Sequence, residues 1–162
     1  MCLEIGECKS EEGIGVKKPA KSNKYLEAKL AQLEKFDAAI EGDVDADVCI
    51  MAFGVLPPQV DSALRAACAS LGMPDPVVVD ASQIANGADA LWVVEGLDPT
   101  AVIVADEVTA ALLADGYHAE LPLDAPGRLL GRPLAAFTSF EADLGDDKMK
   151  QRDWAVLKTL KE

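Results

Sequence analysis

Apolar residues along the chain form two recurring patterns, and their alternation predicts the fold class. Four mostly apolar runs are predicted to be strands: Val48–Phe53, Val77–Val79, Ala101–Ala105 and Pro133–Phe140. Apolar residues three or four apart predict helices after these strands, over residues 58–71, 84–95, 106–114 and 146–160. Strands that alternate with helices indicate a parallel sheet. We therefore expect an α/β fold, a three-layer α/β/α sandwich with a small, mostly parallel sheet.

The N-terminal part of the chain predicts a helix ahead of the first strand. Residues 1–21 combine glycine, proline and scattered charge, and we expect a loosely ordered arm there. Residues 22–162 then form a single α/β domain. Over residues 22–40 the apolar residues recur at helical spacing, with Lys and Glu on the other face: Leu26, Leu30, Leu33 and Ile40. This amphipathic helix must cover the sheet or pair with a second chain, so a homo-oligomer is one expectation.

Three segments leave alternatives open. Residues 84–95 fit a helix face, although Leu91–Val94 alone could be a strand, and we favour the helix. Residues 117–132 form a long connection with two prolines and two glycines, which hides a short fifth strand or forms a lid. Residues 41–47, with four acids and one glycine, are predicted to be a linker.

Charge is divided unevenly along the 162 residues, which carry a net charge of -13. Twenty acidic and three basic residues lie from Asp37 to Asp147, whereas the last fifteen residues contain five basic and two acidic residues. Such an acidic body repels phosphate polymers and anionic lipid, so we expect no nucleic-acid and no membrane partner. No apolar run reaches the roughly 20 residues of a membrane span, and the N-terminus lacks a signal-peptide pattern. A cytoplasmic location is the expectation.

The four cysteines indicate little about the chemistry of the protein. Cys49 and Cys68 lie in apolar segments and are predicted to be buried small hydrophobic residues. Cys2 and Cys8 lie in the polar head, either as two reduced thiols or as a disulfide or metal clip. No Cys-x-x-Cys or Cys/His pair supports a metal site, so none is assigned.

Polar residues at the predicted strand ends are the main candidates for a ligand site. Ligands of open parallel sheets bind outside the carboxyl ends of the strands. The candidates at those ends are Gly54, Asp80, Ser82, Asp106, Glu107, Ser139 and Glu141. Asp80, Asp106 and Glu141 could converge on Mg²⁺, which binds carboxylates and phosphate. Alternatively, Asp and Ser at these junctions are helix N-caps.

Two arginines and the single histidine complete the candidate site. Arg128 and Arg132 flank a short apolar stretch in the long connection, where they either bind an anionic ligand or pair with nearby acids. His118 follows a predicted helix and is either a general base or a favourable charge at the helix C-terminus. Glycine-rich phosphate loops and nucleophile motifs are absent, so no cofactor is expected.

These residues support two expectations about function. The first is a non-catalytic α/β module that binds a small ligand or a partner protein. The second is a small Mg-dependent enzyme, of the phosphatase or phosphoryl-transfer type, that uses the strand-end carboxylates. Fold class alone does not distinguish them, because one fold supports many chemistries.

Overall fold

The computed structural model describes residues 23–161 of the chain. The predicted arm of residues 1–21, with Cys2 and Cys8, lies outside the described residues. The strands of the described part form one six-stranded sheet in the order β1-β3-β2-β4-β6-β5. Their bounds are β1 Ile40–Glu41, β2 Val48–Ala52, β3 Val77–Asp80, β4 Ala101–Val104, β5 Ala125–Leu129 and β6 Arg132–Ala136.

The central four strands are parallel, and an antiparallel strand lies at each edge. β3, β2, β4 and β6 pair in parallel, whereas β1 pairs antiparallel with β3 and β5 antiparallel with β6. The expected α/β fold with a mostly parallel sheet is therefore confirmed. The chain crosses from β3 over β2 to reach β4, so the direction of strand addition reverses at β2. At such a reversal the loops that leave the two neighbouring strands separate, which creates a crevice.

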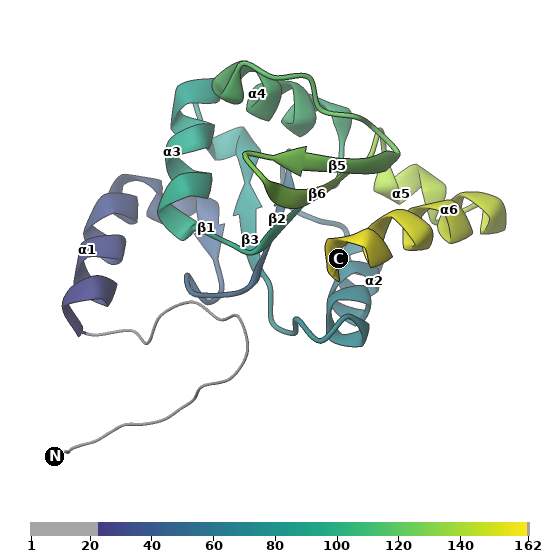
Figure 1. The fold of residues 1–162 in the computed structure, drawn as a ribbon, viewed down its shortest axis with the longest axis horizontal. Coiled ribbons are helices and arrows are strands. Elements are labelled where there is room, and N and C mark those ends of the chain that lie inside the picture. Colours follow the sequence, from purple (N-terminus) through teal and green to yellow (C-terminus); the bar gives the residue numbers. More distant parts are fainter. Residues whose placement is uncertain (1–22, 162) are drawn as a thin grey trace, which may run out of the picture.

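Helices cover both faces of this sheet (Figure 1). The α-helices are α1 Asn23–Leu33, α2 Pro58–Ser70, α3 Gly87–Leu97, α4 Glu107–Tyr117, α5 Phe140–Asp143 and α6 Asp147–Lys158. Three 3₁₀ helices accompany them within the described residues: η2 Glu34–Ala39, η3 Ala81–Gln83 and η4 Thr159–Lys161. Helices α1, α3 and α4 pack on one face of the sheet, and α2, α5 and α6 pack on the other.

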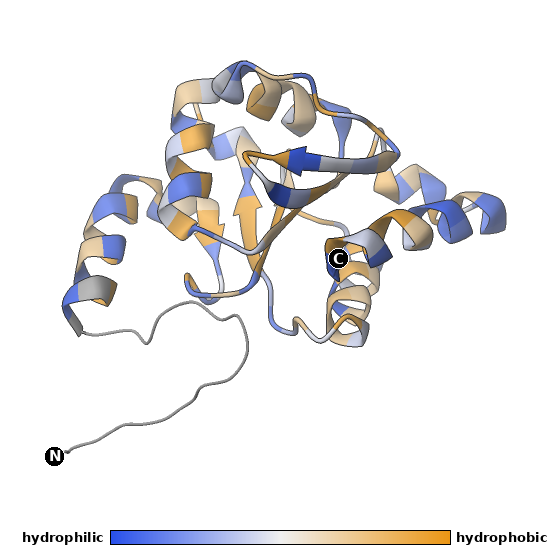
Figure 2. Ribbon diagram, in the orientation of Figure 1, coloured by the Kyte–Doolittle hydropathy of each residue, from blue (hydrophilic) through white to orange (hydrophobic). Residues whose placement is uncertain are grey.

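Alternating side chains of the central strands fill both cores. In β2, Cys49 and Met51 join the core beneath α1, α3 and α4, while Val48 and Ile50 join the core beneath α2 and α6. All four are fully buried. A strand buried on both faces needs apolar residues at every position, which explains the continuous runs in the sequence. Figure 2 shows this hydrophobic colouring in the central strands, whereas the helices carry mixed colours.

The N-terminal helix differs from its prediction in length and in its buried face. α1 ends at Leu33 and η2 follows it, while β1 takes the last residue of the predicted helix, Ile40, and the first of the predicted linker, Glu41. Lys29, predicted on the polar face, is only 5% exposed, whereas Leu30 is exposed. The Lys29 ammonium donates to the carbonyl of Leu97 at 2.9 Å and to Asp45 Oδ1 at 3.0 Å. These bonds compensate for the cost of burying the charge. Contacts with other segments, rather than the apolar spacing within the helix, therefore decide which face of α1 is buried.

The long connection of residues 117–132 contains a strand, β5, which forms a hairpin with β6. Leu130 and Gly131 make its two-residue turn with φ values of 50° and 87°. Two successive positive φ angles match the twist of paired strands. The predicted strand Pro133–Phe140 is wrong at its C-terminal end, because β6 stops at Ala136 and α5 starts at Phe140.

Residues 84–95 fall mainly in a helix, as favoured, but the residues that recur there at helical spacing, Ile84, Ala88, Leu91, Trp92 and Glu95, are not all buried. α3 buries Val93, Val94 and Leu97, whereas Trp92 is 49% exposed. The side chain of Asn86 caps the helix by accepting from the backbone N–H of Asp89 at 2.9 Å. The helix therefore starts at Gly87, three residues later than the sequence predicts.

Close packing of α3 against α4 depends on two glycines. A Cβ placed on Gly87 would lie 2.6 Å from the backbone nitrogen of Gly116. We expect Gly87→Ala to lower the free energy of unfolding by about 1–3 kcal/mol, because the helices would have to move apart. Gly145→Ala is the control, since its Cβ would be no closer than 3.6 Å to a non-neighbouring atom. Urea denaturation measures both, and equal stability of the two variants would contradict the prediction.

Candidate functional site

The loop from β2 to α2 lies at the carboxyl edge of the sheet, and two strand-end carboxylates hold it. Asp106, which follows β4, accepts the backbone N–H of Phe53 at 2.8 Å through Oδ2. Its other oxygen accepts the backbone N–H of Thr109 at 2.8 Å and caps α4. Asp106 is therefore the helix N-cap that the sequence allowed, and it also fixes the loop from a neighbouring strand.

Asp80 holds the next residue of the same loop. Its Oδ1 accepts from the backbone N–H of Gly54 at 2.8 Å and from the N–H and hydroxyl of Ser82 at 2.9 and 2.6 Å. Burial alone would raise the pKa of Asp80, but these hydrogen bonds outweigh it and lower the pKa below its usual value. Gly54 has a φ of 99°, a left-handed conformation that glycine adopts without strain.

Two hollows flank this loop, and Val55 and Leu56 line both. The larger, about 520 Å³, has Gly54 and Asp80 in its wall. The remaining lining residues of the larger hollow are Ala38, Ala39, Glu41, Pro58, Asp61, Arg65 and Val78. The smaller, about 140 Å³, has Asp106, Ser139 and Glu141 in its wall. Five of the seven predicted strand-end residues are thus divided between two neighbouring hollows, whereas Ser82 and Glu107 are in the lining of neither.

The loop also exposes apolar side chains between its two fixed backbone groups. Phe53 is 55% exposed and Val55 is 90% exposed. Exposed apolar residues that stand alone are ordinary, but these two occur together at the mouths of two hollows. Their positions could not be predicted from the sequence, where Phe53 was assigned to the buried strand.

The three carboxylates proposed for Mg²⁺ do not form a compact group. Among the described residues, a single cluster of at least three candidate metal-ligating side chains has its ligand atoms within 4.8 Å of one another, and it contains none of Asp80, Asp106 and Glu141. Ser139 accepts the backbone N–H of Ala142 at 3.2 Å and caps α5. Glu107 is exposed in the first turn of α4.

The two candidate arginines have different surroundings. Arg132 donates to Glu95 at 2.7 Å, to Asp98 at 3.2 Å and to the carbonyl of Pro99 at 3.0 Å. These contacts connect β6 to the C-terminal end of α3. Arg128 is exposed and donates to the carbonyl of Gly131 at 3.0 Å in its own hairpin.

Glu95 is the centre of a polar network that the sequence did not reveal. Its Oε2 accepts both the Arg132 guanidinium and the hydroxyl of Tyr117, the latter at 2.6 Å. Burial would raise the pKa of Glu95, but these donors lower it; burial and the Glu95 carboxylate raise the pKa of Tyr117. His118 caps α4 in a left-handed conformation, with φ 53°, and is exposed. The network joins β6, α3 and α4 rather than lining either hollow.

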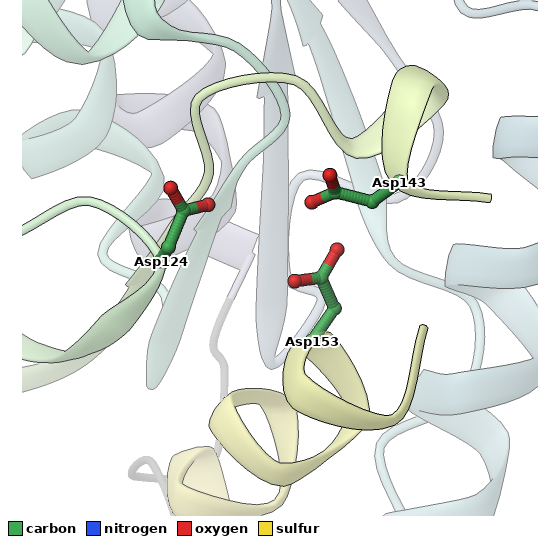
Figure 3. A group of neighbouring side chains, drawn as sticks. All are labelled: Asp124, Asp143 and Asp153. Atoms are coloured by element: carbon green, nitrogen blue, oxygen red, sulfur yellow. The ribbon is translucent and has the colours of Figure 1, made fainter. Parts of the chain in front are cut away.

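A separate acidic cluster lies where β5, α5 and α6 meet, formed by Asp124, Asp143 and Asp153 (Figure 3). Nη2 of Arg152 contacts all three carboxylates, at 3.2, 2.9 and 3.1 Å respectively. Burial and the neighbouring Asp143 carboxyl raise the pKa of Asp153 to about 7, against the opposing effect of Arg152. No pattern in the sequence predicted this cluster, because its members are far apart along the chain and none follows a predicted motif.

The two described cysteines are buried, as predicted. Burial raises the pKa of Cys49 to about 12 and that of Cys68 to about 11, and the positive charges of Arg132 and Arg65 offset this only in part. A thiol with so high a pKa is almost entirely protonated at neutral pH and is a poor nucleophile. Both side chains therefore serve packing.

Removing the Arg132 guanidinium should destabilise the fold. Arg132→Met leaves Glu95 without its cationic partner and the Pro99 carbonyl without its donor, so we expect the free energy of unfolding to fall by about 1–3 kcal/mol. Arg128→Met is the control and should stay within about 0.5 kcal/mol of the wild type. Chemical denaturation measures both. Equal losses would show that the Arg132 network contributes nothing specific.

The raised pKa of Asp153 predicts a pH dependence of stability. Between its ordinary pKa of 3.8 and its folded pKa of about 7, the folded protein holds a proton that the unfolded chain releases. Ionisation of this carboxyl therefore lowers stability as pH rises through that window. Relative to the wild type, Asp153→Asn should become progressively more stable from pH 4 to 7 and then level off. Thermal unfolding across this range measures the difference, and a flat difference would contradict the assignment.

Comparisons with known proteins leave the chain without a family assignment. No protein-family model matches the sequence, and no curated protein matches it significantly. Within residues 23–161, no helix combines the length and apolar character needed to cross a membrane. Any functional assignment must therefore come from the arrangement of the described side chains.

Proposed function

We propose that the chain is a non-catalytic α/β module that binds a small ligand in the larger hollow, beside the β2–α2 loop. The observation that carries this proposal is the pairing of a fixed backbone with exposed apolar side chains. In the wall of the larger hollow, Asp80 holds the N–H of Gly54 and Val55 is 90% exposed. On the other side of the loop, Asp106 holds the N–H of Phe53, which lines the smaller hollow. The folded protein already holds this apolar loop in one conformation. A ligand that contacts the loop therefore binds without the further loss of conformational entropy that ordering a flexible loop would cost.

The position and size of the hollow support a small molecule as the ligand. It lies at the carboxyl ends of β2 and β3, next to the strand where the order of the sheet reverses. Ligands of open parallel sheets bind outside the carboxyl ends of the strands, and the crevice of the reversal itself, between β2 and β4, contains the neighbouring smaller hollow. Its volume of about 520 Å³ lies within the usual range of small-molecule sites, roughly 300–1,000 Å³.

Charge on the wall indicates the class of ligand. The lining contains three carboxylates, Glu41, Asp61 and Asp80, and one cation, Arg65. Arg65 Nε already contacts both oxygens of Asp61, at 2.9 and 3.0 Å. The wall therefore carries a net negative charge, which attracts cations and repels phosphate or carboxylate groups. A small organic amine with an apolar portion against Val55 and Leu56 suits this wall best.

The alternative of a Mg-dependent enzyme has less support. Asp80 accepts three hydrogen bonds and Asp106 accepts two, so metal binding would have to displace bonds that hold the loop. Asp80 also lines a different hollow from Asp106 and Glu141. Asp80 and Asp106 already have structural roles as helix caps and supports of the loop. Arg65, the cation in the wall of the larger hollow, is already paired with Asp61 rather than free to bind a phosphate.

Thermal unfolding with a panel of small amines, matched carboxylates and phosphates tests the proposal. We expect an amine to raise the melting temperature, with about 2.7 kcal/mol of stabilisation at 100 times its Kd, and the anions to have no effect. Val55→Ser should weaken binding and leave stability unchanged, since Val55 is 90% exposed.

Leu130→Ser is the matched control, because Leu130 is also largely exposed but lies in the β5–β6 turn. It should bind the amine like the wild type. A panel without any stabilising amine would overturn the proposal, as would equal loss of binding in the two serine variants. If the chain bound a protein instead of a small molecule, sedimentation or size-exclusion measurements would show a complex larger than the single chain.

A further inference from the structure

We propose that Asp124, Asp143 and Asp153 form a binding site for a hard divalent cation, whose position the guanidinium of Arg152 takes in the metal-free protein. This site is separate from the proposed ligand site, and it contains none of the side chains that line either hollow beside the β2–α2 loop. Its support comes from ligand spacing, from one buried oxygen without a partner, and from charge.

The spacing of the oxygens suits a cation with carboxylate ligands. One oxygen from each aspartate lies within 4.8 Å of the others. Ca²⁺ binds oxygens at about 2.3–2.6 Å, so two ligands on opposite sides of the ion lie about 5 Å apart. Figure 3 shows the carboxyl groups of Asp143 and Asp153 facing each other, with Asp124 across from both. Carboxylates alone, without His or Cys, favour a hard ion such as Ca²⁺ or Mg²⁺ over a transition metal.

A buried oxygen of Asp153 provides the second observation. Asp153 is only 2% exposed, and its Oδ2 has no hydrogen-bond partner among the described residues. Leaving such an atom unpaired is costly, because it has lost its water and gained nothing. Arg152 contacts the other oxygen, Oδ1, at 3.1 Å. A bound cation would satisfy Oδ2 directly, in place of the proton that this carboxyl group holds below its pKa of about 7.

Charge in the cluster is not balanced by the arginine alone. Three carboxylates face one guanidinium, and all three approach the same nitrogen, Nη2. Nε of Arg152 also donates to Asp153 Oδ1, at 3.2 Å, so the guanidinium contacts every carboxyl group but brings a single positive charge. A divalent ion brings two positive charges and accepts several carboxylates at once. The Arg152 side chain is 36% exposed, so it can move into water when an ion enters.

The surrounding structure holds the ligands at the junction of three segments. Asp124 precedes β5, and both its oxygens accept from Thr138, at 3.2 Å from the N–H and 2.8 Å from the hydroxyl. Asp143 ends α5 and Asp153 lies in α6. An ion here would therefore fasten the C-terminal helix to the edge hairpin of the sheet. Asp124 and Asp143 keep partial exposure, which leaves a path for the ion and its remaining water ligands.

Calorimetric and thermal titrations of the full chain with CaCl₂ and MgCl₂, after treatment with a chelator, test the site. We expect saturable binding of one ion and a higher melting temperature for the wild type. Asp143→Asn should weaken binding about tenfold or more, since it removes one of three charged ligands. Asp147→Asn is the matched control: Asp147 is the first residue of α6, the helix that holds Asp153, is almost fully exposed, and its variant should bind like the wild type.

Arg152→Gln distinguishes an ion site from a purely structural ion pair. If the guanidinium competes with the ion, this variant should bind Ca²⁺ about tenfold more tightly than the wild type while being less stable without metal. Absence of saturable binding by the wild type would overturn the proposal, and so would binding that Asp143→Asn and Asp147→Asn weaken equally. Binding by Arg152→Gln alone would also overturn it, since the native site would then belong to the arginine.

Discussion

Burial of β2 on both faces is the constraint on which the rest of the structure depends. Its five residues, Val48–Ala52, are buried and pair with β3 on one side and β4 on the other. A strand in this position cannot contact water, so helices must cover both faces, and its ends are where the chain can become polar. The loop that leaves β2 is therefore the first solvent-facing segment at the centre of the sheet.

Polar groups at the borders of the two cores are paired with particular partners, and these pairs fix how the segments meet. Lys29 reaches the carbonyl of Leu97 and fastens α1 to the end of α3. Arg132 connects β6 to the same end of α3 through Glu95. Asp106 connects the start of α4 to the loop after β2. In each case a single side chain satisfies backbone or charged groups from two elements, as buried polar groups require.

The acidic composition has several structural explanations. Asp106 and Asp146 cap α-helices and Asp80 caps η3, so part of the acid serves helix starts. Asp61 pairs with Arg65 one turn later in α2. The cluster of Asp124, Asp143 and Asp153 differs, because three acids share one arginine and one oxygen stays unpaired. Only a few of the many acidic residues therefore have a particular structural or binding role, and the net charge of the chain does not show which ones.

The sequence by itself determined the class of fold and most of the elements. Aliphatic runs identified the buried strands, because a strand that is buried on both faces has no position for a polar side chain. Prolines, glycines and capping residues marked the helix ends. It also offered helix N-caps as one of two roles for Asp80, Asp106 and Ser139, and all three do cap helices, since that role depends on local spacing. Only the tertiary structure decided the edge strands β1 and β5, the buried face of α3, the pairing of Lys29 and Arg132, and the acidic cluster. These features depend on contacts between segments far apart in the chain, where local periodicity carries no information about which charge meets which partner.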